Sequence, residues 1–459
     1  MREDLAGHVL RVDALHAPER GEAEALPDAL IAVDPDGVIT DVRVAGAPGY
    51  DRALRAAGAR LVTAPPGAVL LPGLVDLHVH APQYPQLGTA LDLPLEEWLL
   101  RYTFPLEARY GDPGFARVVY DRLVRALLAQ GTTTAVYFAT IHDAATCLLA
   151  DLCLRHGQRA FVGRVAMDHP ETCPEAYRDP SAEAALAGTR RVVEHIRAAP
   201  GNAGGRVRPM VAPRFIPSCT DTLLAGLGDL AREADVAVTT HVSESDWEHG
   251  FVRDRHGMSD AESLDRFGLL RPGSVLAHGC FLSDGDMGLM RDRGTGVAHC
   301  PWSNAYFANA VFPLRRALDI GVPVGLGSDI SGGPVGSIWE TARMALVAAR
   351  LRASGTDPDL APQARSRHRG DRVDAVTAFW LATAGGADAL GLAAGRFRPG
   401  QRLDAMLLVP GDDTSVIAPW PGEDAAPARR LERLLHGTSR SDIAAVFVDG
   451  RRVAGARAP

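Results

Sequence analysis

Short apolar runs alternate with longer amphipathic stretches through the middle of the chain, and this pattern restricts its fold more than any other feature. We count eight runs: "VLLPGLVDLHVH", "TTTAVYFAT", "RAFVGRVAM", "VRPMVAPRF", "VAVTTHVSE", "SVLAHGCF", "GVAHCPWSN" and "VPVGLGSD". Apolar runs separated by helical stretches are typical of parallel strands in βα units. Eight units predict an α/β fold, the (β/α)8 TIM barrel. A doubly wound open sheet competes with it, but no G-x-G-x-x-G follows the first run.

The two ends of the chain have a different, period-two pattern. "ALIAVDPDGVITDVRV" places Asp36-Gly37, and "IAAVFVDGRRVAG" places Asp449-Gly450, between alternating apolar residues, which predicts two hairpins. A lone hairpin is marginally stable in water, so we expect both ends to complete one small β-sandwich domain. The expected organisation is residues 1–70 and 396–459 for that domain, with residues 71–395 forming the catalytic barrel.

Composition excludes several classes of function. The net charge of −8 disfavours nucleic acid as a partner, because binding its backbone needs a concentrated basic face. All 48 basic residues are arginine, which rules out a Schiff base, a P-loop lysine and a carbamylated lysine bridging two metals. The six cysteines form no C-x-x-C pair, and no long apolar segment or export leader is visible. We therefore expect a cytoplasmic protein that does not bind a membrane.

Polar residues with metal-binding chemistry follow the ends of four runs. His78 and His80 are two apart and so share one face of a strand. His241, His278 and Asp329 lie at the ends of the fifth, sixth and eighth runs, and a barrel directs such ends into one pocket. Three imidazoles and a carboxylate suit zinc or ferrous iron. Without a bridging lysine, we expect one metal with an open position for water, whose pKa it lowers to about 7.

A proton carrier is also needed, and Glu244 follows His241 by three residues. Its alternative role is to cap the next helix. His278 could be a ligand, a partner of a ligand, or the group that orients the attacking hydroxide; we favour the last. Asp329 supplies the fourth metal contact, although it could instead be only a helix cap.

Several segments carry a more specific resemblance. They are "PGLVDLHVHAPQYPQLGTALDLPLEEWLLRYTFPLEARY", "YFATIH", "GQRAFVGRVAMD", "VAPRFIPSC", "AHGCFLS", "AHCPWSN" and "LGSDISGG". Over most of residues 70 to 395 they resemble the guanine deaminase family of the amidohydrolase superfamily. The resemblance implies hydrolytic deamination of guanine to xanthine and ammonia by a homodimer. It implies one zinc per chain, with Fe²⁺ as the other candidate, bound by the following residues: His78, His80, His241 and Asp329. Glu244, His278 and Asp329 would carry the proton and align the hydroxide.

The resemblance also implies a purine pocket. It places Gln83, Arg214 and Phe215 against the base, and the donors of Arg214 suit the O6 acceptor of guanine. Phe215 could instead be an ordinary core aromatic residue. Trp98 is expected to close over the base, unless it is a packed helix residue.

One departure leaves the heterocycle open. In "CPWSN", Trp302 stands where the family usually has a small or polar residue, and Tyr306 and Phe307 follow it near the expected pocket mouth. The alternatives are a deaminase of 8-oxoguanine, of isoxanthopterin or another pterin, or of a triazine. A rival of another class is an inactive barrel that serves as an interaction scaffold, against which the complete ligand set and Glu244 argue.

Overall fold

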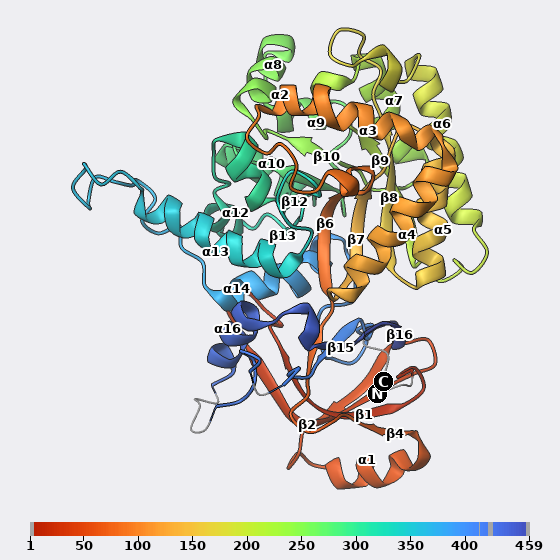
Figure 1. Cartoon of the computed structure of the whole chain (residues 1–459), viewed down its shortest axis with the longest axis vertical. Coiled ribbons are helices and arrows are strands. Elements are labelled where there is room, and N and C mark those ends of the chain that lie inside the picture. The colour runs from red at the N-terminus through yellow and green to blue at the C-terminus, as the bar shows by residue number, and fades with distance from the viewer. Residues whose placement is uncertain (1–3, 413, 421–425, 456–459) are drawn as a thin grey trace.

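The computed structural model describes residues 4–412, 414–420 and 426–455. A barrel of strands and helices occupies one end of the molecule, and a smaller sheet occupies the other (Figure 1). The first and last described parts of the chain both lie at the small sheet (Figure 1). None of the helices in the described ranges is long and apolar enough to cross a membrane.

The eight apolar runs form the eight barrel strands, in two parallel four-stranded sheets. One sheet contains β6 (Leu74–His80), β7 (Thr132–Phe138), β8 (Arg159–Ala166) and β9 (Val207–Pro213). The other contains β10 (Thr239–Val242), β11 (Val275–His278), β12 (Gly296–His299) and β13 (Val324–Leu326). The predicted barrel fold is confirmed. Almost every residue of the eight parallel strands is buried, as expected for parallel strands that are covered on both faces.

Backbone contacts join the two sheets at both seams. A parallel bridge links Val211 to Val238 on one side. On the other, the amide of Asp329 donates to the His78 oxygen at 2.9 Å, and the amide of His80 donates to the Ile330 oxygen at 3.1 Å. The second seam therefore runs directly between two of the segments that carry the candidate metal ligands.

Amphipathic helices cover the outside of the barrel (Figure 1). Their apolar faces pack on the strands, and a polar side chain caps the start of most of them. At the start of α7, for example, the Thr220 hydroxyl accepts a hydrogen bond from the Leu223 amide. The helices are α4 (Pro113–Ala129), α5 (Asp143–His156), α6 (Ala182–Ala198), α7 (Asp221–Glu233), α8 (Asp246–His256), α9 (Asp260–Arg266), α10 (Asp284–Asp292), α12 (Leu314–Ile320), α13 (Ile338–Ser354), α14 (Ala375–Trp380) and α15 (Gly386–Ala389).

Short helical segments lie over the mouth of the barrel. α2 (Leu95–Trp98) and α3 (Phe104–Ala108) are joined by a π-helical turn at Leu99–Thr103. α11 (Pro301–Ser303) continues into a second π-helical turn at Asn304–Ala308. Such turns are frequent at functional sites, because they redirect side chains within a helix.

Strands from both ends of the chain form one small sheet, as the two terminal patterns predicted. The strand order is β16-β15-β14-β5-β1-β2-β3, with β4 paired to β1. The strands are β1 (Val9–His16), β2 (Glu24–Val33), β3 (Ile39–Arg43), β4 (Leu61–Thr63), β5 (Val69–Pro72), β14 (Ala405–Leu408), β15 (Ile443–Val448) and β16 (Arg451–Ala454). The helices α1 (Tyr50–Ala57) and α16 (Pro427–Gly437) accompany it.

A buried ion cluster fastens this sheet to the barrel. Arg159, on barrel strand β8, donates to Asp404 at 2.8 Å and to Asp449 at 2.6 Å. All three side chains are buried. The carboxylates thus satisfy an arginine that would otherwise be an unpaired buried charge.

Candidate active site and metal centre

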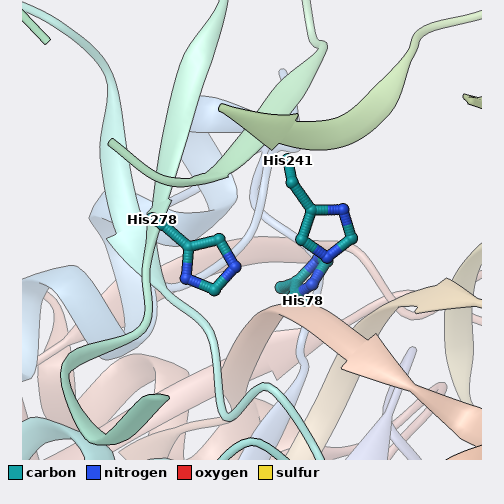
Figure 2. A group of neighbouring side chains, drawn as sticks. All are labelled: His78, His241 and His278. Carbon is teal, nitrogen blue, oxygen red and sulfur yellow. The ribbon is translucent and has the colours of Figure 1, made fainter. Parts of the chain in front are cut away.

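The predicted metal ligands converge at the carboxyl end of the barrel strands. His78 and His80 end β6, His241 lies on β10, and Asp329 follows β13 by three residues. His278 is the last residue of β11. Figure 2 shows the rings of His78, His241 and His278 entering one space from different parts of the barrel. Strand alternation turns His78 and His80 to the same side, as the spacing predicted.

Four ligand atoms form a compact cluster. His80 Nε2 lies 3.2 Å from His78 Nε2 and 3.0 Å from His241 Nε2. Asp329 Oδ1 lies 3.4 Å from His78 Nε2 and 3.5 Å from His80 Nε2. A tetrahedron with metal–ligand bonds of about 2.0–2.1 Å has edges of about 3.3 Å. The four measured distances therefore fit one divalent metal held by three imidazoles and a carboxylate. His78, His80 and Asp329 by themselves lie close enough to share an ion.

The imidazoles are in the form that a metal needs. Burial, followed by the neighbouring imidazoles, lowers the pKa of His80 and His241 well below the ordinary value, and burial also lowers that of His78. His241 Nδ1 donates to the Arg214 backbone oxygen at 2.5 Å, which leaves the Nε2 lone pair facing the cluster. Neutral rings whose lone pairs converge repel one another unless a cation lies between them.

His278 is held in a fixed orientation beside the cluster. Its Nδ1 donates to Asn304 Oδ1 at 3.0 Å. Its buried Nε2 lies 3.6 Å from Glu244 Oε2 and 4.0 Å from Asp329 Oδ2, and has no hydrogen-bond partner in the described part of the chain. This nitrogen is therefore available to a metal or to a reacting molecule.

Glu244 points into the same space from the loop between β10 and α8. Its Oε1 accepts a hydrogen bond from the Ser303 hydroxyl at 3.2 Å, and its amide donates to Glu248 Oε2 at 2.7 Å. Burial raises the pKa of Glu244 above its ordinary value. A carboxyl group with a raised pKa is suited to taking up and returning a proton. The cap of α8 is Ser245, so capping does not occupy Glu244.

A pocket opens above the cluster, with about 430 Å³ of unfilled space when its mouth is included. The structure brings all four predicted substrate residues to its wall. The lining comprises His80, Gln83, Leu95, Trp98, Leu99, Arg214, Phe215, His241, Glu244, Ser303, Phe307, Asp329 and Gly332. Gly332 allows a close approach here, because a Cβ at that position would lie 2.7 Å from Asp329 Oδ2.

Two aromatic residues close the pocket on one side. The Trp98 ring lies 5.1 Å from that of Phe307, and its indole nitrogen donates to the Thr89 oxygen at 3.0 Å. Trp302 is not part of the pocket lining; it packs against Gly333, where a Cβ would lie 2.7 Å from its own Cβ. Tyr306 is exposed. The departure noted in "CPWSN" therefore changes the support of a loop and not the pocket wall.

Glu107, which lies behind the pocket wall and contacts two of its residues, was missed by sequence reasoning. Although fully buried, it accepts hydrogen bonds from Arg214 at 2.6 and 3.2 Å and from Gln83 Nε2 at 2.9 Å. The available signal was an acid alone in the apolar segment "TFPLEARY", since such a residue needs a buried partner. Asn304, which holds His278, was missed in the same way.

The chain matches the model of the amidohydrolase family over residues 69–453. It is 37% identical over 390 residues to guanine deaminase of Homo sapiens, covering 83% of this chain and 82% of that protein. It is 36% identical over 391 residues to a probable guanine deaminase of Schizosaccharomyces pombe, covering 84% and 71% of the two chains.

A solved structure is similar over nearly the whole length. The crystal structure of guanine deaminase from C. acetobutylicum with bound guanine in the active site has a TM-score of 0.85 and 28% identity. The match covers 97% of this chain and 99% of that one.

Proposed function

This chain belongs to the amidohydrolase family, and from that premise we propose that it hydrolyses guanine to xanthine and ammonia. One observation carries the proposal: a single pocket combines the His–Asp cluster, Glu244 and the Arg214–Gln83 pair. The first group suits activation of water, the second suits proton transfer and the third suits a polar purine edge. The relatives named above favour guanine over pterins and triazines.

We assign one zinc ion per chain, or Fe²⁺ in its place, to His78, His80, His241 and Asp329, whose ligand atoms are linked by distances of 3.0–3.5 Å. Such a metal would make a water molecule acidic enough to act as a nucleophile near neutral pH. The side chains of the cluster are buried, which strengthens the charge interactions between them.

Glu244 is the proton carrier in this proposal. Its Oε2 takes a proton from the attacking water as the C2–O bond forms, and returns it to the 2-amino nitrogen as the C2–N bond breaks and ammonia leaves. The second water proton moves to a ring nitrogen as the C2 carbonyl of xanthine forms. Ser303 holds the other carboxyl oxygen, so Oε2 stays directed toward the reacting atoms.

His278 positions the attacking oxygen. Because Nδ1 donates to Asn304, the neutral ring presents Nε2 as an acceptor for an O–H of the water. This assignment makes Asn304 a positioning residue that acts through His278.

The base is recognised from the opposite side of the pocket. Arg214 has five N–H donors, of which Glu107 accepts two, so others remain for O6 of guanine. Gln83 contacts a polar edge of the base, Phe215 covers one face of the ring and Trp98 closes the mouth. Arginine has no acceptor, so it cannot bond the exocyclic amine that adenine carries in place of O6.

Substrate choice tests the function directly. In a panel of guanine, 8-oxoguanine, isoxanthopterin, cytosine and adenine, guanine is expected to have the highest kcat/KM and adenine no measurable turnover. A buried polar mismatch at Arg214 costs about 1–3 kcal/mol, which by itself disfavours adenine by about 5-fold to 150-fold. Adenine also has no amino group at C2 for the reaction to release. Arg214→Met is expected to raise KM and lower kcat/KM for guanine with metal content unchanged. A kcat/KM for 8-oxoguanine or isoxanthopterin tenfold above that for guanine would contradict the assignment.

Asn304→Ala is expected to lower kcat about 10-fold to 100-fold while metal content stays unchanged, because His278 loses the acceptor that orients it. Asn304→Asp keeps an oxygen at this position and should retain more activity than the alanine variant. Steady-state kinetics with metal analysis checks both. Equal loss in the two variants would show that the bond to His278 is not what matters.

We further propose that the enzyme works as a homodimer in the cytoplasm. The dimer follows the family resemblance. The location is supported by the six cysteines, which are all free in the structure, as expected for a reducing compartment. Size-exclusion chromatography with light scattering tests the dimer, and fractionation of the source cells tests the location.

A further inference from the structure

Glu107 connects the two polar residues of the base-binding wall. It lies on α3, whereas Arg214 follows β9 and Gln83 follows β6. Its Oε1 accepts from both Gln83 Nε2 and Arg214 Nη2, and its Oε2 accepts from Arg214 Nη1. The remaining polar atom of the Gln83 amide, Oε1, accepts from the Ser331 amide at 3.2 Å. The orientation of the amide is therefore set on both sides.

The contacts of Glu107 also bear on the charge of the base-binding wall. Three N–H donors point at the two oxygens of Glu107, an arrangement that suits the acceptor-only carboxylate group. The side chains of Glu107 and Arg214 are 0% and 3% exposed, so water screens the pair very little. The attraction of Glu107, with its hydrogen bonds, overcomes burial and raises the pKa of Arg214 above its ordinary value. The wall therefore offers the N–H donors of Arg214 to the base, while the Glu107–Arg214 pair as a whole has no net charge.

Substrate and product of the proposed reaction differ in charge behaviour. Guanine is neutral near neutral pH. Xanthine is the stronger acid, because an imide-like N–H replaces the amidine of guanine, and in mildly alkaline solution it is an anion. An arginine without a buried counter-ion would attract that anion strongly, since charge interactions are large at a dry site.

We propose that Glu107 is a positioning residue that cancels the charge of Arg214 and fixes the Gln83 amide, so that the pocket prefers neutral guanine to the more acidic product xanthine. This inference rests on the proposed function and adds a determinant of substrate preference and product release. It predicts opposite effects on the two ligands when the carboxylate is lost, whereas a purely structural role predicts parallel losses.

The experiment uses the metal-loaded full-length protein with Glu107→Gln, in buffer alkaline enough for xanthine to be an anion. The inhibition constant of xanthine, also measured as a Kd by calorimetry, is expected to fall about 10-fold, because an uncancelled guanidinium in a low dielectric attracts the anion. In the same variant, kcat/KM for guanine should fall about 10-fold, mainly through KM, because the Gln83 amide is no longer fixed. Glu107→Asp keeps the charge and should leave xanthine binding near the wild-type value.

Two further variants isolate the charge. In Glu107→Gln combined with Arg214→Met, the tighter binding of xanthine must disappear, because the cation is gone. Glu340→Gln removes a carboxylate that binds Arg343 on α13, outside the pocket, and should change neither constant. If Glu107→Gln does not fold, Arg214→Met alone tests the same cancellation of charge. In that variant the Glu107 carboxylate has lost its cation, and its negative charge must weaken binding of the xanthine anion more than binding of neutral guanine.

Weaker or unchanged binding of xanthine in Glu107→Gln would overturn the inference. So would equal weakening of both ligands in Arg214→Met. Failure of the wild-type protein to deaminate guanine would instead contradict the proposed function, and the binding measurements separate the two cases.

Discussion

Glu244→Gln is expected to lower kcat for guanine by ~10²-fold or more with the metal still bound, because glutamine keeps the shape of the side chain and cannot take up the proton. This corresponds to about 2.7 kcal/mol of lost transition-state stabilisation. The expected size follows from the surroundings of Glu244: burial raises its pKa, Ser303 holds one oxygen, and the other faces His278. Steady-state kinetics and metal analysis on the same preparation provide the measurement.

The matched control for this change is Glu233→Gln. Glu233 is an exposed acid that pairs with Arg190 on the helical outside of the barrel, so its loss should leave turnover unchanged. Glu248→Gln is a sharper comparison, because the only hydrogen bond described for the Glu248 side chain is with the backbone amide of Glu244. Its effect on kcat should be smaller than that of Glu244→Gln. Near-normal turnover of Glu244→Gln would place the proton carrier elsewhere.

The purified protein should contain close to one zinc or iron per chain, and His78→Ala or Asp329→Ala should remove most of both the metal and the activity. The reason is the spacing of the ligand atoms, which matches the edges of one tetrahedral site, so that loss of one side chain leaves that site incomplete. Metal content measured by mass spectrometry, together with kcat, checks the result.

His195→Ala is the control for metal loss, because His195 is exposed and pairs with Asp151 far along the helical surface. Full metal content in both His78→Ala and Asp329→Ala would contradict the ligand assignment.

Chelation of the wild-type protein should abolish turnover without unfolding it. A core of this size does not depend on a catalytic metal for its stability. Circular dichroism of the chelated protein provides that measurement.

The local pattern predicted most of the architecture and the ligand types. The eight apolar runs became the eight barrel strands, and Asp36-Gly37 and Asp449-Gly450 each lie between paired strands of the terminal sheet. Periodicity succeeds because side-chain direction depends only on neighbouring residues. The rule that strand ends of a barrel share one face then gathered His78, His241 and Asp329 without any knowledge of their distances.

The partners of those residues could not be predicted in the same way. The sequence singled out Arg214 as a donor for the base, but only the tertiary structure pairs it with Glu107, 107 residues earlier in the chain. Only the tertiary structure, likewise, shows that Asn304 accepts a hydrogen bond from His278 and that Trp302 packs against Gly333 outside the pocket lining. Residue type and periodicity define which face a side chain occupies. Which distant atom a side chain contacts depends on how the barrel closes and how the π-helical turns pack over its mouth. These in turn depend on the geometry of all the segments between the two residues, which no local pattern contains.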